Sequence, residues 1–153
     1  MKINTERQVY FQGNCDELEV FHQICKYFEN IEKEIKELKL KKDLCSIGAY
    51  ECIHYSFISP ADFDMMNLPA DAPEREAIRI LNPINEDLSI MRTTLASSML
   101  YAISRNQKKG NLEGRLYEVA NKFIPESLPL TAYPEERAAL SVGVWGGSED
   151  FFT

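Results

Sequence analysis

The sequence lacks several features that would place it in a special class of protein. It has no run of about 18 apolar residues, which excludes a membrane-spanning helix. Its N-terminus lacks the charged and then apolar segments of a secretory signal, so no such leader is expected. Basic residues are outnumbered by acidic ones: the chain has 17 lysines and arginines and 24 aspartates and glutamates, which gives a net charge of −7. A protein that binds a nucleic-acid backbone by bulk charge would be basic, so this class is not expected.

Cysteine is scarce too. Its four positions are Cys15, Cys25, Cys45 and Cys52. They include no Cys-x-x-Cys pair and are too sparse for a disulfide-stapled secreted domain. Reduced thiols are the simplest interpretation, so we expect a cytoplasmic protein. A zinc site that combines these cysteines with His22 and His54 is a less favoured alternative, because the spacings fit no common zinc pattern, and we expect no metal site.

What remains is the composition of an ordinary globular domain. Hydrophobic residues make up 44% of the 153 residues and charged residues 27%. We expect a single module over residues 14–153, a truncated piece in which a helix over 16–47 leads into a core over 48–153. The stretch VYFQG at 9–13 looks like the end of an engineered protease-cleavage sequence. Residues 1–13 are therefore expected to be an engineered or disordered leader, with native sequence of similar appearance as the alternative.

The segment 16–47 is predicted to be helical. Its apolar residues recur at spacings of 3 and 4 and form a narrow stripe along one side of a helix: they are Phe21, Ile24, Phe28, Ile31, Ile35 and Leu38. The stripe suits either a sheet or another helix as its partner, and it is too short to prove a coiled coil. Gly48 is a natural end for this helix, because glycine adopts the left-handed conformation past a helix terminus.

Residues 49–58 alternate as a β-strand does, with Ile53, Tyr55 and Phe57 on one side and Cys52 and His54 on the other. Further strands are predicted over 78–81, 115–123 and 140–144, and a short helix over 62–66. Residues 124–137 contain three prolines and are predicted to form a loop. Strands do not alternate with helices as in a doubly wound parallel sheet. An α+β fold on an antiparallel sheet flanked by helices is therefore expected.

A second long helix is predicted over 95–107, with Thr94 as its cap. Its buried face is expected to hold Leu95, Met99, Leu100 and Ile103. The lysines at 108 and 109 favour the helix dipole at the end of this helix.

Few residues suggest chemistry. The sequence has neither a glycine-rich phosphate loop nor a Gly-x-Ser-x-Gly elbow. A catalytic pair of His54 and Cys52 is disfavoured, because such positions on a strand face are also core or rim positions. Eight basic residues could anchor anions: Arg75, Arg79, Arg92, Arg105, Lys108, Lys109, Arg115 and Lys122. We favour surface partners for nearby acids as their role.

Several segments carry a resemblance to one family. LCSIGAYECIHYSFISP at 44–60 resembles the start of the catalytic-like module in the beta subunit of bacterial phenylalanyl-tRNA synthetase. ILNPINEDLSIMRTTLASSMLYAISRN at 80–106 is similar to that family's Asn-Pro turn and the helix after it, and GNLEGRLYEVANKF at 110–123 to its next strand. EER at 135–137 and DFF at 150–152 fit its tail. The first 43 residues do not match well, since a charged helix stands where the family has a small DNA-binding-like domain.

The resemblance implies a class II aminoacyl-tRNA synthetase-like fold, and it also bears on activity. Active class II enzymes carry a strand that ends in Phe-Arg-x-Glu, whose arginine binds the ATP α-phosphate. The corresponding stretch here is FIPE at 123–126, so Ile124, which has neither charge nor hydrogen-bond donor, replaces that arginine. A later motif with another ATP-binding arginine is not found before Thr153. We therefore expect no catalytic residue and no cofactor site in this module.

By the same resemblance, the chain is expected to support phenylalanine–tRNA ligation by packing against the catalytic alpha subunit, where phenylalanine, ATP and Mg²⁺ would bind. The expected interface residues are Leu44, Ile47, Ile53, Tyr55 and Phe57. Arg92 is expected to orient a local turn rather than bind a ligand. Direct contact with tRNA is left open. The alternatives are a homodimerising module that uses the stripe within 21–38, or a small synthetase paralogue in which Arg92 or Arg115 binds the phosphate.

Overall fold

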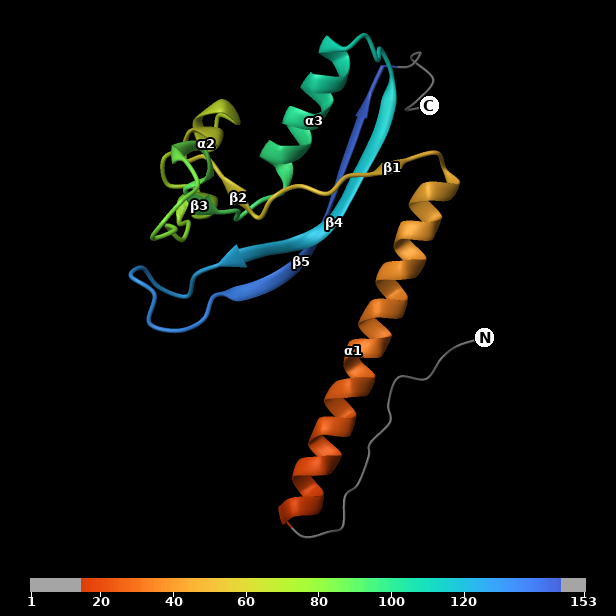
Figure 1. The fold of residues 1–153 in the computed structure, drawn as a ribbon, viewed down its shortest axis with the longest axis vertical. Helices are drawn as coiled ribbons and strands as arrows, with labels where there is room; N and C mark the ends of the chain where they lie inside the picture. Colours follow the sequence, from red (N-terminus) through yellow and green to blue (C-terminus); the bar gives the residue numbers. More distant parts are fainter. Residues whose placement is uncertain (1–14, 147–153) are drawn as a thin grey trace. The chain divides into compact units, whose positions relative to one another are not determined.

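The computed structural model describes the backbone of residues 15–146 and the side chains of residues 29–146 (Figure 1). The leader predicted over 1–13 and the family-like tail at 150–152 lie outside these described residues. The chain divides into two compact units, residues 1–40 and residues 41–153, and each is described by itself. The fold is α+β, as predicted: it combines helices with a mixed three-stranded sheet and a two-stranded sheet.

The first unit contains most of helix α1, Cys15–Ser46, which confirms the helix predicted over 16–47. Within the described part of the apolar stripe, Ile31 is half-buried, whereas Ile35 and Leu38 are 59% and 67% exposed. The last turns of α1 belong to the second unit. The helix ends as predicted at Gly48, whose φ of +80° is a conformation that glycine adopts without strain.

The main sheet of the second unit is built on a long hairpin. Strand β4, Gly114–Ile124, pairs in antiparallel fashion with β5, Glu135–Trp145, over all eleven residues of each. Strand β1, Tyr50–Glu51, lies on the other side of β4 and runs parallel to it. The prediction of a purely antiparallel sheet is therefore wrong for β1. The long connection between β1 and β4 contains a helix, and such crossover connections are what parallel pairing requires.

A small second sheet pairs β2, Phe57–Ile58, with β3, Ile90–Met91. Its core consists of Ile58, Phe63 and Ile90, and Phe63 belongs to α2, Ala61–Met65, close to the short helix predicted over 62–66. Two 3₁₀ turns, Pro73–Arg75 and Glu86–Leu88, flank this core. The strand predicted over 78–81 is wrong and is replaced by a single bridge from Arg79 to Ile90, because β3 is too short to pair with more of it.

Helix α3, Ala96–Lys108, agrees with the helix predicted over 95–107. The Thr94 hydroxyl accepts a hydrogen bond from the Ala96 N–H at 3.2 Å, but the N-cap position is Leu95, so the prediction of Thr94 as the cap is wrong by one residue. Leu95 and Met99 are buried as expected. The prediction fails at Leu100, which is 54% exposed, since it lies about 100° around the helix from Met99.

Helix α3 lies against one face of the β4–β5 hairpin, and Gly143 makes this close approach possible. A Cβ atom at this position would stand 2.6 Å from Ile103 Cδ1 and 2.9 Å from Met99 Sδ. Any larger residue would therefore force the Ile103 and Met99 side chains to shift.

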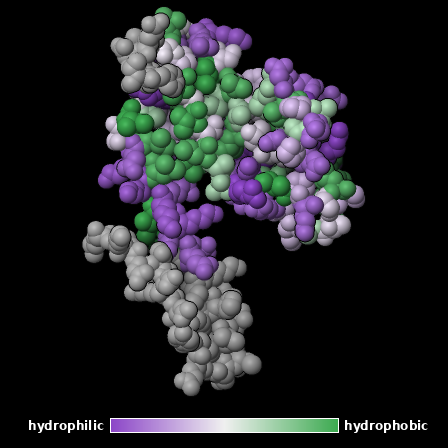
Figure 2. All heavy atoms as spheres, turned by 180° about the vertical axis from the view of Figure 1, so that it is seen from behind, coloured by the Kyte–Doolittle hydropathy of each residue, from purple (hydrophilic) through white to green (hydrophobic). Residues whose placement is uncertain are grey.

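The other face of the hairpin is partly open. Because side chains alternate along a strand, Leu140, Val142 and Val144 lie on the face away from α3, and they are between 44% and 49% exposed. Figure 2 shows hydrophobic residues gathered over this part of the second unit. Tyr117, which pairs with Val142 in the hairpin, is fully buried. None of the helices within residues 15–146 is long and apolar enough to cross a membrane.

Candidate interaction site

The residues predicted to form an interface lie between the end of α1 and β2, in the second unit. Leu44 and Phe57 are half-buried. Ile47, Ile53 and Tyr55 are 64%, 91% and 71% exposed. Grouped large apolar side chains that remain in water are typical of surfaces that bind another molecule. Their use as an interface stays a prediction, but three of the five are accessible for it.

The strand predicted over 49–58 is interrupted, and this is the main local error of the sequence-based prediction. Residues 52–56 leave the main sheet after β1 and enter the second sheet at β2. At the two ends of this segment, the Cys52 N–H donates to the Tyr117 carbonyl at 2.6 Å and the Arg92 N–H donates to the Ser56 carbonyl at 2.9 Å. Alternating residues indicate a strand, but no strand ladder accompanies them here.

Side chains replace that ladder in the middle of the segment. The His54 N–H donates to Glu118 Oε1 at 3.3 Å, and Arg92 Nη1 donates to the Tyr55 carbonyl at 3.3 Å. Buried backbone polar groups must find partners of some kind. The carboxylate and the guanidinium supply these partners, so the segment can bridge two sheets without pairing with either.

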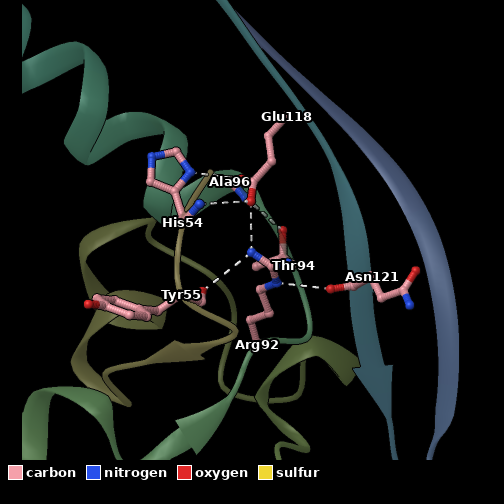
Figure 3. A network of polar contacts seen from close by, with 7 residues as sticks. All are labelled: His54, Tyr55, Arg92, Thr94, Ala96, Glu118 and Asn121. Atoms are coloured by element: carbon pink, nitrogen blue, oxygen red, sulfur yellow. Dashed lines mark hydrogen bonds and ion pairs between the residues drawn. The ribbon is translucent and has the colours of Figure 1, made fainter. Parts of the chain in front are cut away.

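The two side chains that serve this segment form a buried ion pair (Figure 3). The Glu118 and Arg92 side chains are only 2% and 4% exposed, and Arg92 Nη1 lies 2.9 Å from Glu118 Oε1. Arg92 Nε also donates to the Asn121 carbonyl at 2.9 Å. Burying charges is costly unless each is paired and hydrogen-bonded, and here both conditions are met.

His54 completes this network at the surface. Its Nδ1 lies 2.8 Å from Glu118 Oε2, and its side chain is 23% exposed. An ionised carboxylate only accepts hydrogen bonds, so Nδ1 carries the hydrogen in this contact. In the neutral ring Nε2 is then an acceptor, and Figure 3 shows it on the far side of the ring from Glu118.

His54 also lines a groove of about 970 Å³ between residues 53–59, α2 and α3. Its walls combine aromatic and aliphatic side chains, among them Tyr55, Phe57, Met65 and Tyr101. Its ionisable groups besides His54 are Tyr55, Asp62, Asp87, Tyr101 and Arg105. A large, mostly apolar hollow with a few polar groups suits recognition of another molecule.

One polar contact inside the groove is already made. The Tyr101 hydroxyl donates to Asp62 Oδ1 at 3.2 Å, and Asp62 is buried. Burial, and then the charge of Asp62, raise the pKa of the Tyr101 hydroxyl. The hydroxyl therefore stays protonated and keeps its role as a donor at neutral pH.

The Cys52 thiol shows no sign of nucleophilic activation. Burial raises the pKa of the Cys52 thiol, and the charges of Glu118 and Glu51 raise it further. The thiolate, which is the reactive form, is thus disfavoured at Cys52, the residue that would form a catalytic pair with His54. Cys45 Sγ lies 3.3 Å from the Tyr117 hydroxyl oxygen. Mainly through this contact and burial, the pKa of Tyr117 rises to about 12.

A zinc site would need several histidine, cysteine or carboxylate ligands close together. Among the side chains that the structure describes, no group of three such residues could hold a metal ion. Cys15, His22 and Cys25 lie outside those side chains.

Among the eight basic residues that could anchor anions, Arg92 and Arg75 have internal partners. Arg92 is buried in the network described above, and the hydrogen bonds of its guanidinium group reach Tyr55, Glu118 and Asn121 rather than a local turn, so its expected role in orienting a local turn is not seen. Arg75 donates to Asp64 Oδ1 at 2.8 Å and to the carbonyls of Leu68 and Pro69. Their guanidinium groups are therefore occupied by the protein itself.

Ile124 is the last residue of β4, and it is half-buried opposite Glu135. It offers an apolar side chain at the position where the resemblance would require a phosphate-binding cation. The nearby backbone is also engaged, since the Phe123 N–H donates to the Arg92 carbonyl at 2.9 Å. Ile124 itself therefore offers no group for a nucleoside triphosphate, and the absence of a nucleotide site in this chain stays a prediction.

Glu118 is the functional candidate that the sequence-based prediction missed. Its only signal is an acidic residue between Tyr117 and Val119, in the middle of a strand predicted to pack in a sheet. A carboxylate at such a position needs a cation, whereas the sequence predicts that Arg92 orients a turn or pairs with an acid at the surface. Their proximity depends on the path of the chain through α3, which sequence periodicity does not specify.

Comparison with known proteins identifies relatives of this chain. A family model described as the phenylalanyl tRNA synthetase beta chain CLM domain matches residues 29–152. The chain is 38% identical over 127 residues to the phenylalanine–tRNA ligase beta subunit of Clostridium tetani, covering 83% of this chain and 16% of that protein. The beta subunit of Clostridium acetobutylicum is 37% identical over 108 residues, or 71% of this chain and 14% of the relative.

A third beta subunit, from Moorella thermoacetica, is 36% identical over 112 residues, which is 69% of this chain and 14% of that protein. The chain thus spans about one seventh of the length of the curated relatives it matches. The matched region contains the whole of the network and the groove. This chain belongs to the phenylalanyl-tRNA synthetase beta chain CLM domain family.

Proposed function

We propose that this chain is a non-catalytic, class II synthetase-like module of a phenylalanine–tRNA ligase beta subunit, and that it supports ligation by packing against the catalytic alpha subunit. The match over residues 29–152 is the observation that carries this proposal. The accessible apolar side chains of Ile47, Ile53 and Tyr55 support it, because they supply a surface that a partner can cover. A cytoplasmic location follows from the same proposal.

The chemistry of phenylalanine activation is assigned to the alpha subunit, which would hold ATP and Mg²⁺. Within this chain, Ile124 stands where a phosphate-binding arginine would be needed, and Arg92 is buried in an internal ion pair. A synthetase paralogue that uses Arg92 as its phosphate ligand would have to break that pair first.

Two measurements on the 153-residue chain and an alpha subunit from the same organism test the proposal. Gel filtration is expected to show co-elution of the two chains. ATP–pyrophosphate exchange with phenylalanine is expected from the alpha-containing complex and not from this chain alone. Separate elution of the two chains would remove the structural role, and exchange by the isolated chain would contradict its non-catalytic character.

Self-association is a second candidate function, favoured by the exposure of Ile35 and Leu38 on α1. An amphipathic helix with an accessible apolar stripe can pair with a copy of itself. Analytical ultracentrifugation of the chain and of a variant with aspartate at Ile31 and Ile35 distinguishes this candidate. A dimer that dissociates on substitution supports it, and a monomer in both samples rejects it.

A further inference from the structure

The segment 52–56 holds two large apolar side chains in water although it is not part of a strand. Ile53 is 91% exposed and Tyr55 is 71% exposed. The backbone around them is nevertheless fixed, because polar groups of residues 52, 54, 55 and 56 all bond to β4, Glu118 or Arg92. In Figure 3 the Tyr55 ring points away from Glu118 while its carbonyl faces Arg92. The segment therefore presents its apolar side chains in a fixed outward arrangement.

We propose that Glu118 and Arg92 are positioning residues that preset Ile53 and Tyr55, which line the groove together with His54, as a docking pair for the alpha subunit. This inference rests on the proposed function, because it takes the alpha subunit as the occupant. The positioning passes through two contacts to the segment, from Glu118 to the His54 amide and ring and from Arg92 to the Tyr55 carbonyl.

Preorganisation gives this arrangement a role in binding. A partner that meets an ordered surface does not have to bear the entropy of ordering it, so affinity rises without any new contact. Aromatic side chains that act as anchors contribute strongly to interfaces. Tyr55 has such an aromatic ring, and Ile53 supplies aliphatic surface that lines the same groove.

The groove next to the pair indicates what part of the alpha subunit fits. Asp62 and Asp87 place two carboxylates along it against the single guanidinium of Arg105. The balance is negative. We expect the occupant to be a segment with an apolar side chain next to a lysine or arginine, since opposite charges across an interface set register and speed association.

Titration calorimetry with the alpha subunit tests the docking pair. Ile53→Ala and Tyr55→Ala are each expected to weaken affinity by about tenfold or more, the range of an interface anchor. Ile84→Ala and Tyr133→Ala are matched controls, since those residues are 76% and 99% exposed and do not line the groove. Their affinities are expected to stay within about twofold. Equal effects at both pairs, or no effect at Ile53 and Tyr55, would overturn the docking surface.

A charge reversal tests the chemistry of the occupant. Asp87→Lys is expected to slow association several-fold, whereas Asp71→Lys, an exposed aspartate that does not line the groove, is expected to change it little. Faster association of the Asp87→Lys protein would show that the occupant is acidic and would overturn this part of the proposal.

Amide hydrogen exchange in the free chain, followed by NMR, tests the positioning role without any partner. Glu118→Gln keeps the shape of the side chain and loses its charge, and exchange at the residue 54 amide is expected to rise about tenfold or more while the β4–β5 amides stay protected. Glu113→Gln, an exposed glutamate just before β4, is the control. Unchanged exchange at residue 54 would overturn the positioning role.

His54→Ala serves where Glu118→Gln fails to fold, because it removes one contact at the edge of the network and leaves the ion pair. It is expected to weaken affinity for the alpha subunit several-fold alone and to add little in the Ile53→Ala/Tyr55→Ala background, since coupled residues are not additive. Fully additive effects would overturn positioning through this pair. If the unsubstituted chain does not bind the alpha subunit, the proposed function and the docking pair fall together, while the exchange result still decides the positioning role.

Discussion

The β4–β5 hairpin and the segment 52–56 satisfy their backbone groups in opposite ways. The hairpin uses an eleven-residue ladder in which each strand serves the other. The segment uses the side chains of Glu118 and Arg92, which come from β4 and from the chain just after β3. A ladder depends little on side-chain identity, whereas a side-chain network fails when one member is lost. The same unit therefore contains one region that tolerates side-chain substitution, the hairpin, and one that does not, the segment 52–56 with its network.

The largest loss of stability is expected when the side-chain network of Glu118 and Arg92 is disrupted. Glu118→Ala removes the partner of a buried guanidinium, and an uncompensated buried charge costs about 3–5 kcal/mol in the free energy of unfolding. Urea unfolding measures this loss. Arg137→Ala, which removes the exposed ion pair between Glu135 and Arg137, is the control and should leave the urea midpoint unchanged. Similar midpoints for both variants would mean that the network does not hold the segment.

A smaller effect is expected in the hairpin, at the one point where packing constrains it. Gly143→Ala places a Cβ against Ile103 and Met99 of α3, and overpacking of this kind costs about 1–3 kcal/mol. Thermal unfolding is a suitable measurement. Ala138→Val adds methyl groups to an exposed position of the same strand and should change stability much less. A neutral Gly143→Ala would show that α3 can move away from the sheet.

The mildest test uses pH at the contact between β4 and the last turns of α1. The pKa of Tyr117 is raised from 10 to about 12, so above pH 10 the unfolded chain loses this proton while the folded chain keeps it. Stability present below pH 10 should therefore fall as pH rises from 10 to 12. Tyr117→Phe, which has no proton to lose, should show a shallower decline. Parallel curves of stability against pH for the two proteins would contradict a raised pKa of Tyr117.

Much of the fold follows from periodicity and end signals. The helix over 15–46, its glycine end, α3 and both long strands were predicted within a few residues, because each has a clear period of 3.6 or 2. β5 begins five residues earlier than predicted, at Glu135, since its polar first residues pair with the end of β4. Pairing with a neighbour, rather than the residues themselves, decides such boundaries.

The site was less accessible to prediction. The exposed apolar residues of 47–55 could be proposed because the resemblance marked the segment, yet alternation alone indicated a continuous strand there. The break at 52–56 arises from Glu118 and Arg92, which lie 26 residues apart in the sequence and meet only in the folded chain. Local sequence patterns do not predict a contact between residues so far apart in the chain, so the network is visible only in the three-dimensional structure.

The buried ion pair also limits the ways in which this sequence can change. A codon change that neutralises Glu118 leaves a guanidinium without a counterion, and one that neutralises Arg92 leaves a carboxylate in the same condition. Each single mutant is therefore expected to be less stable than either the unsubstituted protein or a double mutant in which both residues are replaced by apolar ones. Substitutions at these two positions should therefore be epistatic, and a library that varies them singly would miss the apolar pairs that replace them together.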